Sequence, residues 1–142
     1  MAHTYTVDVT TTEGLQGESV PRDVERSVPF AAPPEFGGPG GRWTPEHFLA
    51  AAVNSCVALT FLSAAQQSKL TVASYESSAT ATMDKTADGL RITTVELRPR
   101  IKVTSESDRE RAEKMIRKAE SFCPISNSLT AEVKLEANIE VG

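Results

Sequence analysis

Alternation of apolar and polar side chains marks both ends of this sequence. Residues 4–10 place Tyr5, Val7 and Val9 on one side of an extended chain and polar residues on the other, as a half-buried strand does. Residues 131–141 alternate strictly between apolar residues and charged or amide ones. The pattern therefore predicts one half-buried strand at the start of the chain and another at its end.

Two further strands are predicted in the middle of the chain. Residues 75–83 and 90–103 flank a polar turn and are rich in residues that favour strands. The inward-facing positions start at Leu90 and change parity before Val95, which predicts a β-bulge near Thr93 and Thr94. Before them, the sequence indicates a turn at 13–17, an extended piece to about residue 30, and then a loop rich in Gly and Pro.

Capping residues and helical spacing predict two helices. The Thr44–Pro45 pair supplies a hydroxyl cap and a favoured first residue for a helix over 45–69. Ser107 and Glu110 have the spacing of a capping box, and apolar residues at helical spacing follow, so an amphipathic helix is expected over 108–121. Strands and helices do not alternate regularly, which favours a mixed α+β fold over a doubly wound one.

Composition narrows the class of protein. A chain of 142 residues with 39% apolar and 24% charged residues is typical of a single globular domain, here spanning 1–142. The net charge of −4 and the lack of a basic run argue against nucleic acid as a partner. The first residues do not resemble a secretion signal, so a cytoplasmic location is expected. The apolar stretch 48–65 contains too many polar residues and alanines for a membrane span, and a helix buried in protein is expected instead.

Two cysteines are the candidate reactive groups. Cys56 lies in AAVNSCVALTFL, where burial would raise its pKa, so an inert core thiol is the simplest interpretation. Cys123 precedes Pro124 at the expected start of a short helix, where free backbone amides favour a thiolate. The two thiols could form a reversible pair if their Cα atoms lie within about 4.4–6.8 Å. His3 and His47 have no zinc-site spacing relative to the cysteines, so no metal is expected.

Glu46 is the third candidate residue. In the first turn of the long helix a carboxylate stabilises the helix N-terminus, which is the ordinary explanation for its position. Ten helical residues separate Glu46 from Cys56, or about 15 Å along the axis. If both belong to one site, that site requires a second copy of the helix and hence a dimer.

Two motifs resemble the OsmC/Ohr family of osmotically inducible and organic hydroperoxide resistance proteins. The run GGRWTPEHFLAAAVNSC is similar to the start of the central helix of that family, with its Pro-Glu pair and reactive Cys. The run FCPISNSL is similar to the segment around the second cysteine of the family. The order of elements also agrees along nearly the whole chain.

The resemblance implies an intertwined α+β homodimer and thiol-dependent reduction of peroxides, chiefly organic hydroperoxides. Cys56 would attack the peroxide and Cys123 would then form a disulfide with it. Glu46 would orient an arginine that stabilises the thiolate. No bound cofactor is implied, and an external dithiol of the lipoyl type would reopen the disulfide.

One motif departs from the family. In the hydroperoxide resistance branch the arginine lies in a GRDG-like turn, and the corresponding stretch here, residues 14–17, reads GLQG. The possible replacements are Arg22, Arg26 and Arg42, of which Arg22 is the most attractive because it lies in the same N-terminal region. Two alternatives stay open: a non-catalytic relative that binds a small hydrophobic or thiol compound, and a structural domain with two inert thiols.

Overall fold

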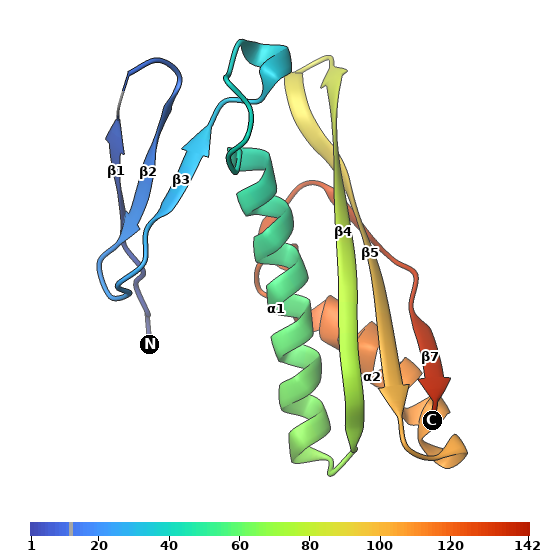
Figure 1. The fold of residues 1–142 in the computed structure, drawn as a ribbon. Coiled ribbons are helices and arrows are strands. Elements are labelled where there is room, and N and C mark those ends of the chain that lie inside the picture. The colour runs from blue at the N-terminus through green and yellow to red at the C-terminus, as the bar shows by residue number, and fades with distance from the viewer. Residues whose placement is uncertain (12) are drawn as a thin grey trace. The chain divides into compact units, whose positions relative to one another are not determined.

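The computed structural model describes residues 1–11 and 13–142. The chain forms two compact units, residues 1–48 and 49–142, and the boundary falls in the first turn of the long helix α1 (Pro45–Gln67). Figure 1 shows the elements of each unit. That the whole chain acts as one domain stays a prediction.

The first unit is an antiparallel sheet in the order β1-β2-β3. Its strands are β1 (Val7–Thr11), β2 (Gln16–Pro21) and β3 (Val28–Ala31), followed by a short 3-10 helix, η1 (Pro34–Phe36). The predicted turn at 13–17 is shorter than expected, because β2 already begins at Gln16.

The first strand differs from its prediction in burial. β1 begins at Val7 instead of residue 4, and Tyr5, Val7 and Val9 are 86%, 58% and 59% exposed. The prediction of a half-buried strand is therefore wrong for the single chain, because the rest of the described first unit does not cover the apolar side of β1. A stretch of alternating residues identifies a strand, but it does not say what packs on that strand.

The second unit is a mixed sheet built around β5. β5 (Gly89–Val103) pairs antiparallel with β4 (Val72–Thr86) and parallel with β6 (Glu132–Leu135) and β7 (Asn138–Val141). The bulge is confirmed, because Thr94 pairs with Thr82 whereas the next pair is Ile92 with Met83, which leaves Thr93 as the extra residue. Leu90 was expected to face inward, but it is 59% exposed near the hairpin turn.

The last strand is interrupted in the middle. β6 and β7 keep one register against β5, with Leu135 opposite Leu97 and Asn138 opposite Arg100. Pro99 of β5 lies opposite the gap and has no N–H to donate to the ladder. The single strand predicted over 131–141 is therefore two short strands.

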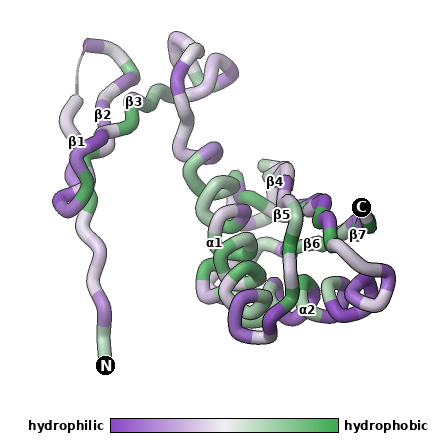
Figure 2. The backbone as a smooth tube through the Cα atoms, turned by 60° about the horizontal axis from the view of Figure 1, so that its bottom comes forward, coloured by the Kyte–Doolittle hydropathy of each residue, from purple (hydrophilic) through white to green (hydrophobic). Residues whose placement is uncertain are grey.

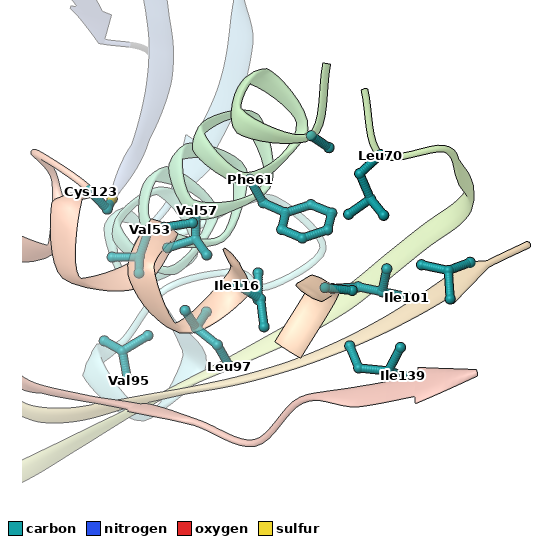
Figure 3. Packing of buried hydrophobic residues seen from close by; sticks show 14 residues of the cluster. Val53, Val57, Phe61, Leu70, Val95, Leu97, Ile101, Ile116, Cys123 and Ile139 are labelled. Carbon is teal, nitrogen blue, oxygen red and sulfur yellow. The ribbon is translucent and has the colours of Figure 1, made fainter. Parts of the chain in front are cut away.

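Both helices pack on one face of this sheet. Alternate residues of β5 are buried beneath α1 and α2 (Arg109–Phe122), whereas Arg98, Arg100 and Lys102 are exposed on the other face. Figure 3 shows the core between the helices and the strands, and Figure 2 shows that α1 is more hydrophobic along its length than α2. Fully buried members of this core include Val53, Val57, Phe61, Leu97, Ile101, Ile116 and Cys123.

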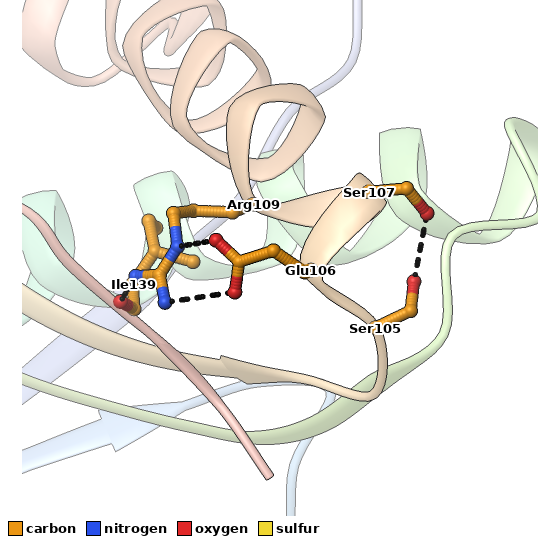
Figure 4. Close-up of polar contacts among 5 residues, drawn as sticks. All are labelled: Ser105, Glu106, Ser107, Arg109 and Ile139. Atoms are coloured by element: carbon orange, nitrogen blue, oxygen red, sulfur yellow. Dashed lines mark hydrogen bonds and ion pairs between the residues drawn. The ribbon is translucent and has the colours of Figure 1, made fainter.

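The helix starts agree only in part with the predicted caps. The amide of His47 donates to the hydroxyl of Thr44 at 3.2 Å, so the Thr44 cap is confirmed. The capping box predicted at Ser107 is not formed, because the chain passes through a 3-10 turn, η2 (Glu106–Asp108), before α2. Figure 4 shows Arg109, the first residue of α2, bound to Glu106 and donating to the carbonyl of Ile139 at 2.6 Å, which ties α2 to β7.

One side of α1 stays uncovered in the single chain. By length and composition alone, α1 could cross a membrane, with a mean hydropathy of 1.8, but a core helix of a globular protein passes the same test. Its buried residues Val53, Val57 and Phe61 recur every four positions, as in a helix packed on a sheet. On the other side Leu59 is 67% exposed and Leu62 is 38% exposed.

Candidate active site

The fold brings the two cysteine thiols together, although they lie 67 positions apart in the sequence. Cys56 lies in the middle of α1, and Cys123 is the first residue after α2. Both are free thiols, and their side chains share a hydrogen bond. Cys123 is completely buried, whereas Cys56 is partly accessible. Of the two, Cys56 is the sulfur that a compound from solvent can reach.

Backbone amides after α2 surround the sulfurs. The amide of Ser126 donates to Sγ of Cys123 at 3.4 Å, and the backbone of Ile125 interacts with both thiols. A short helix was predicted to start at Pro124, but the structure has a turn there and a 3-10 helix, η3, only at Ser126–Ser128. The amides that favour a thiolate are therefore those of a tight turn, and no helix dipole is needed.

The pKa values of the two thiols are shifted in opposite directions. Burial, and then the hydrogen bond to Cys123, raise the pKa of Cys56 above its ordinary value. Burial also acts to raise the pKa of Cys123, but the hydrogen bonds from Cys56, Ser126 and Ile125 outweigh it and lower that pKa. In the single chain Cys123 therefore loses a proton more readily than Cys56 does.

This electrostatic coupling predicts a shift in the alkylation of Cys56. Because the pKa of Cys56 is raised, its reaction with iodoacetamide should accelerate only above the pH at which an ordinary thiol ionises. Cys123→Ser removes the neighbouring thiol and should move the midpoint for Cys56 to lower pH. The measurement is the pH profile of the alkylation rate, followed by mass spectrometry of the peptide that carries Cys56. An unchanged midpoint in Cys123→Ser would contradict the coupling.

Cys56 opens onto an apolar hollow of about 380 Å³. The hollow lies between α1 and the turn after α2. Thr60 is one of its lining residues, and its hydroxyl donates to the carbonyl of Cys56 at 2.8 Å. Alkyl groups and small side chains form the rest of its wall, which suits an apolar group. The other lining residues are Ala52, Ser55, Leu59, Pro124 and Ile125.

Glu46 lies on the same helix as Cys56, near its start. Its Oε1 is buried and forms no hydrogen bond with any residue that the structure describes. Glu46 and Cys56 are ten residues apart on a continuous helix, so they do not meet within one chain. Contacts among the described residues therefore leave Oε1 of Glu46 unpaired, although the carboxylate lies in the first turn of α1, where it stabilises the helix N-terminus.

None of the three candidate arginines pairs with Glu46 among the described contacts. Arg22 forms a two-point ion pair with Asp8, at 2.9 and 3.1 Å, and is 67% exposed. Arg42 donates to the carbonyl of Gly17 at 3.5 Å, and Arg26 is exposed. The role of Glu46 and of these arginines at the site stays a prediction.

Sequence reasoning missed the backbone amides of the turn after α2. Ser126 and Ile125 interact with the sulfurs through their backbone amides. In the sequence, the motif FCPISNSL was the one signal that pointed to this segment. Among the described residues no group of three His, Cys, Asp or Glu side chains could hold a metal ion.

Comparison with known families agrees with this arrangement. Residues 38–138 match the family described as OsmC-like protein. The chain belongs to the OsmC-like family. No curated protein gives a significant match to this sequence.

Solved structures of OsmC-like proteins share the fold. An OsmC-like protein of unknown function from Vibrio cholerae is 25% identical, with a TM-score of 0.87 over 96% of this chain and 99% of that one. An organic hydroperoxide resistance protein from Elizabethkingia anophelis is 22% identical, with a TM-score of 0.77 over 100% of both chains. A protein from Legionella pneumophila with the same description is 22% identical, with a TM-score of 0.75 over 99% of both. The α+β fold and the family predicted from the sequence are thereby confirmed.

Proposed function

We propose that this OsmC-like protein is a thiol peroxidase that reduces organic hydroperoxides. The observation that carries the proposal is the contact between two free thiols, one of which opens onto an apolar hollow. Membership of a family that includes organic hydroperoxide resistance proteins supports a redox role. A reducing compartment such as the cytoplasm would keep both thiols in the reduced form that the reaction requires.

The chemistry balances over three steps. The Cys56 thiolate attacks an oxygen of the hydroperoxide, an S–O bond forms as the O–O bond breaks, and the alkoxide leaves as the alcohol after taking a proton. Cys123, as thiolate, attacks the sulfur of the resulting sulfenic acid. The S–S bond forms as the S–O bond breaks, and the hydroxide leaves as water after taking a proton. An external dithiol reopens the disulfide by two exchange steps and is itself oxidised to a disulfide.

Intact mass and thiol count of the purified protein test this cycle. One equivalent of cumene hydroperoxide should remove both thiols and lower the mass by about 2 Da. Dihydrolipoamide should restore both values. If neither value changes on the folded protein, the thiols do not react with peroxide and the proposal fails.

We further propose that a homodimer completes the site. The raised pKa of Cys56 requires a nearby cation for efficient attack, and none lies among the residues that line its hollow. Glu46 has a buried, unpaired oxygen and stands about 15 Å from Cys56 along α1. The exposed Leu59 and Leu62 on α1 would be covered by a second copy. Glu46 of one chain would thus position an arginine, with Arg22 the first choice, beside Cys56 of the other.

Mixed dimers test the shared site. Cys56→Ser and Glu46→Ala should each lack activity as homodimers, the first because it lacks the nucleophile. A mixed dimer has one site with both residues intact, and so it should regain about half of the wild-type rate. The measurement is peroxide consumption by co-expressed, differently tagged chains. Activity that stays at the level of the homodimers would contradict a site built from two chains.

A non-catalytic binding protein is the second candidate. It is favoured by the GLQG stretch, which lacks the arginine of the hydroperoxide resistance branch, and by the raised pKa of Cys56. In that case the hollow would bind a small hydrophobic or thiol compound without turnover. The mass experiment separates the two candidates, because a binding protein keeps its thiols.

A further inference from the structure

A groove with a volume of about 490 Å³ lies between the second half of α1 and α2. This volume is within the range of sites that bind small molecules. The groove shares Thr60 with the hollow that holds Cys56, but neither cysteine lines it, so a compound can occupy the groove without contact with a sulfur. The side chains of α2 that line the groove are Arg111, Lys114, Met115, Lys118, Ala119 and Phe122.

The charged side chains that line the groove are all positive. There are three of them, and no aspartate or glutamate is among the lining residues. Arg111 is paired with Asp108 at 2.8 Å, and Lys114 is paired with Glu110 at 3.1 Å. Lys118 forms no ion pair with any carboxylate that the structure describes, and its Nζ lies over an aromatic ring instead. One positive charge of the groove is therefore uncompensated.

The ring next to this charge is exposed. Phe122 is 64% exposed, and the centroid of its ring lies 5.7 Å from Nζ of Lys118. Met115 and Ala64 supply further apolar wall, and the sulfur of a methionine makes favourable contacts with aromatic rings. The groove thus combines one free cation with surfaces on which an aromatic ring packs well.

These features are complementary to an aromatic compound with one negative charge. A carboxylate accepts a charge-assisted hydrogen bond from Lys118, while the ring that carries it packs on Phe122 and Met115. Because Nζ of Lys118 lies close to the Phe122 ring, the carboxylate has to be attached close to the ring of the ligand. A second negative charge, as on a phosphate monoester, would find no uncompensated cation. We propose that the groove between α1 and α2 binds a small aromatic carboxylate, independently of the proposed peroxidase function.

Binding of naphthoate tests the site, with naphthamide as a neutral analogue of nearly the same shape. By calorimetry on the full chain, naphthoate should bind about fivefold more tightly than naphthamide, because only the carboxylate pairs with Lys118. Lys118→Gln should remove that difference, and Lys118→Arg, which keeps the positive charge, should retain it. Added salt should weaken the binding of naphthoate and leave the binding of naphthamide unchanged.

Three further variants locate the bound compound. Lys134→Gln is the matched control, because Lys134 is an exposed lysine of β6 that does not line the groove, and it should change neither affinity. Phe122→Ala should weaken both compounds about fivefold, since both lose the same ring contact. Cys56→Ser should leave both affinities unchanged, because Cys56 does not line the groove.

Several results would overturn the proposal. Equal affinities of the two compounds for the wild type, or equal effects of Lys118→Gln and Lys134→Gln, would mean that Lys118 binds no carboxylate. A loss of naphthoate binding in Cys56→Ser would place the compound in the hollow of Cys56 instead. If naphthoate does not bind to the wild-type protein at all, the groove is not a site for aromatic carboxylates.

Discussion

Replacing Cys56 with serine is expected to lower the rate of peroxide consumption by roughly 10³-fold or more, as loss of a nucleophile does. A serine hydroxyl is far less ionised than a thiol at neutral pH and does not attack the O–O bond. The small volume change should leave the fold intact, because Cys56 is only partly buried. The measurement is the steady-state rate with cumene hydroperoxide and an excess of dithiol.

The matched variant is Cys123→Ser, which removes the other thiol of the pair. It keeps the nucleophile, so it should react with one equivalent of peroxide and then stop as a sulfenic acid that dimedone traps. The dimedone adduct on Cys56 is the decisive signal. If Cys56→Ser retained the wild-type rate, Cys56 would not be the peroxidatic residue and Cys123 would have to be considered in its place.

Truncation of Phe61 is expected to produce the largest loss of stability. Phe61 is completely buried at the centre of the core between α1 and the sheet, and it packs against the Tyr75 ring. Phe61→Ala should lower the free energy of unfolding by about 3–5 kcal/mol, because it loses apolar burial and leaves a cavity. Natural domains have only about 5–15 kcal/mol in total, so the variant would be close to unfolding.

The control for this prediction is Leu90→Ala. Leu90 is 59% exposed near the hairpin turn, so its truncation should change the free energy of unfolding by no more than about 0.5 kcal/mol. Both variants should be measured by urea denaturation at one protein concentration, because a dimer adds a concentration-dependent contribution. Similar losses in the two variants would mean that the core is not centred on Phe61.

The sequence alone determined the elements whose signal is local. The Thr44 cap, the long helix after it, the bulge at Thr93 and the second helix all follow from residues a few positions apart. Two motifs, around Cys56 and Cys123, were enough to indicate the family. Such features can be predicted from sequence because side chains return to the same face every 3.6 residues in a helix and every 2 residues in a strand, and a capping residue acts within one turn.

The tertiary structure decided everything that depends on contacts between distant residues. It brought Cys56 to Cys123, paired the last strands parallel to β5, and broke them opposite Pro99. It also left Tyr5 and Leu90 exposed and left Oε1 of Glu46 buried without a hydrogen bond to any described residue. Local patterns cannot specify these features, because burial and hydrogen-bond partners depend on which elements pack together, and packing is set by the whole chain.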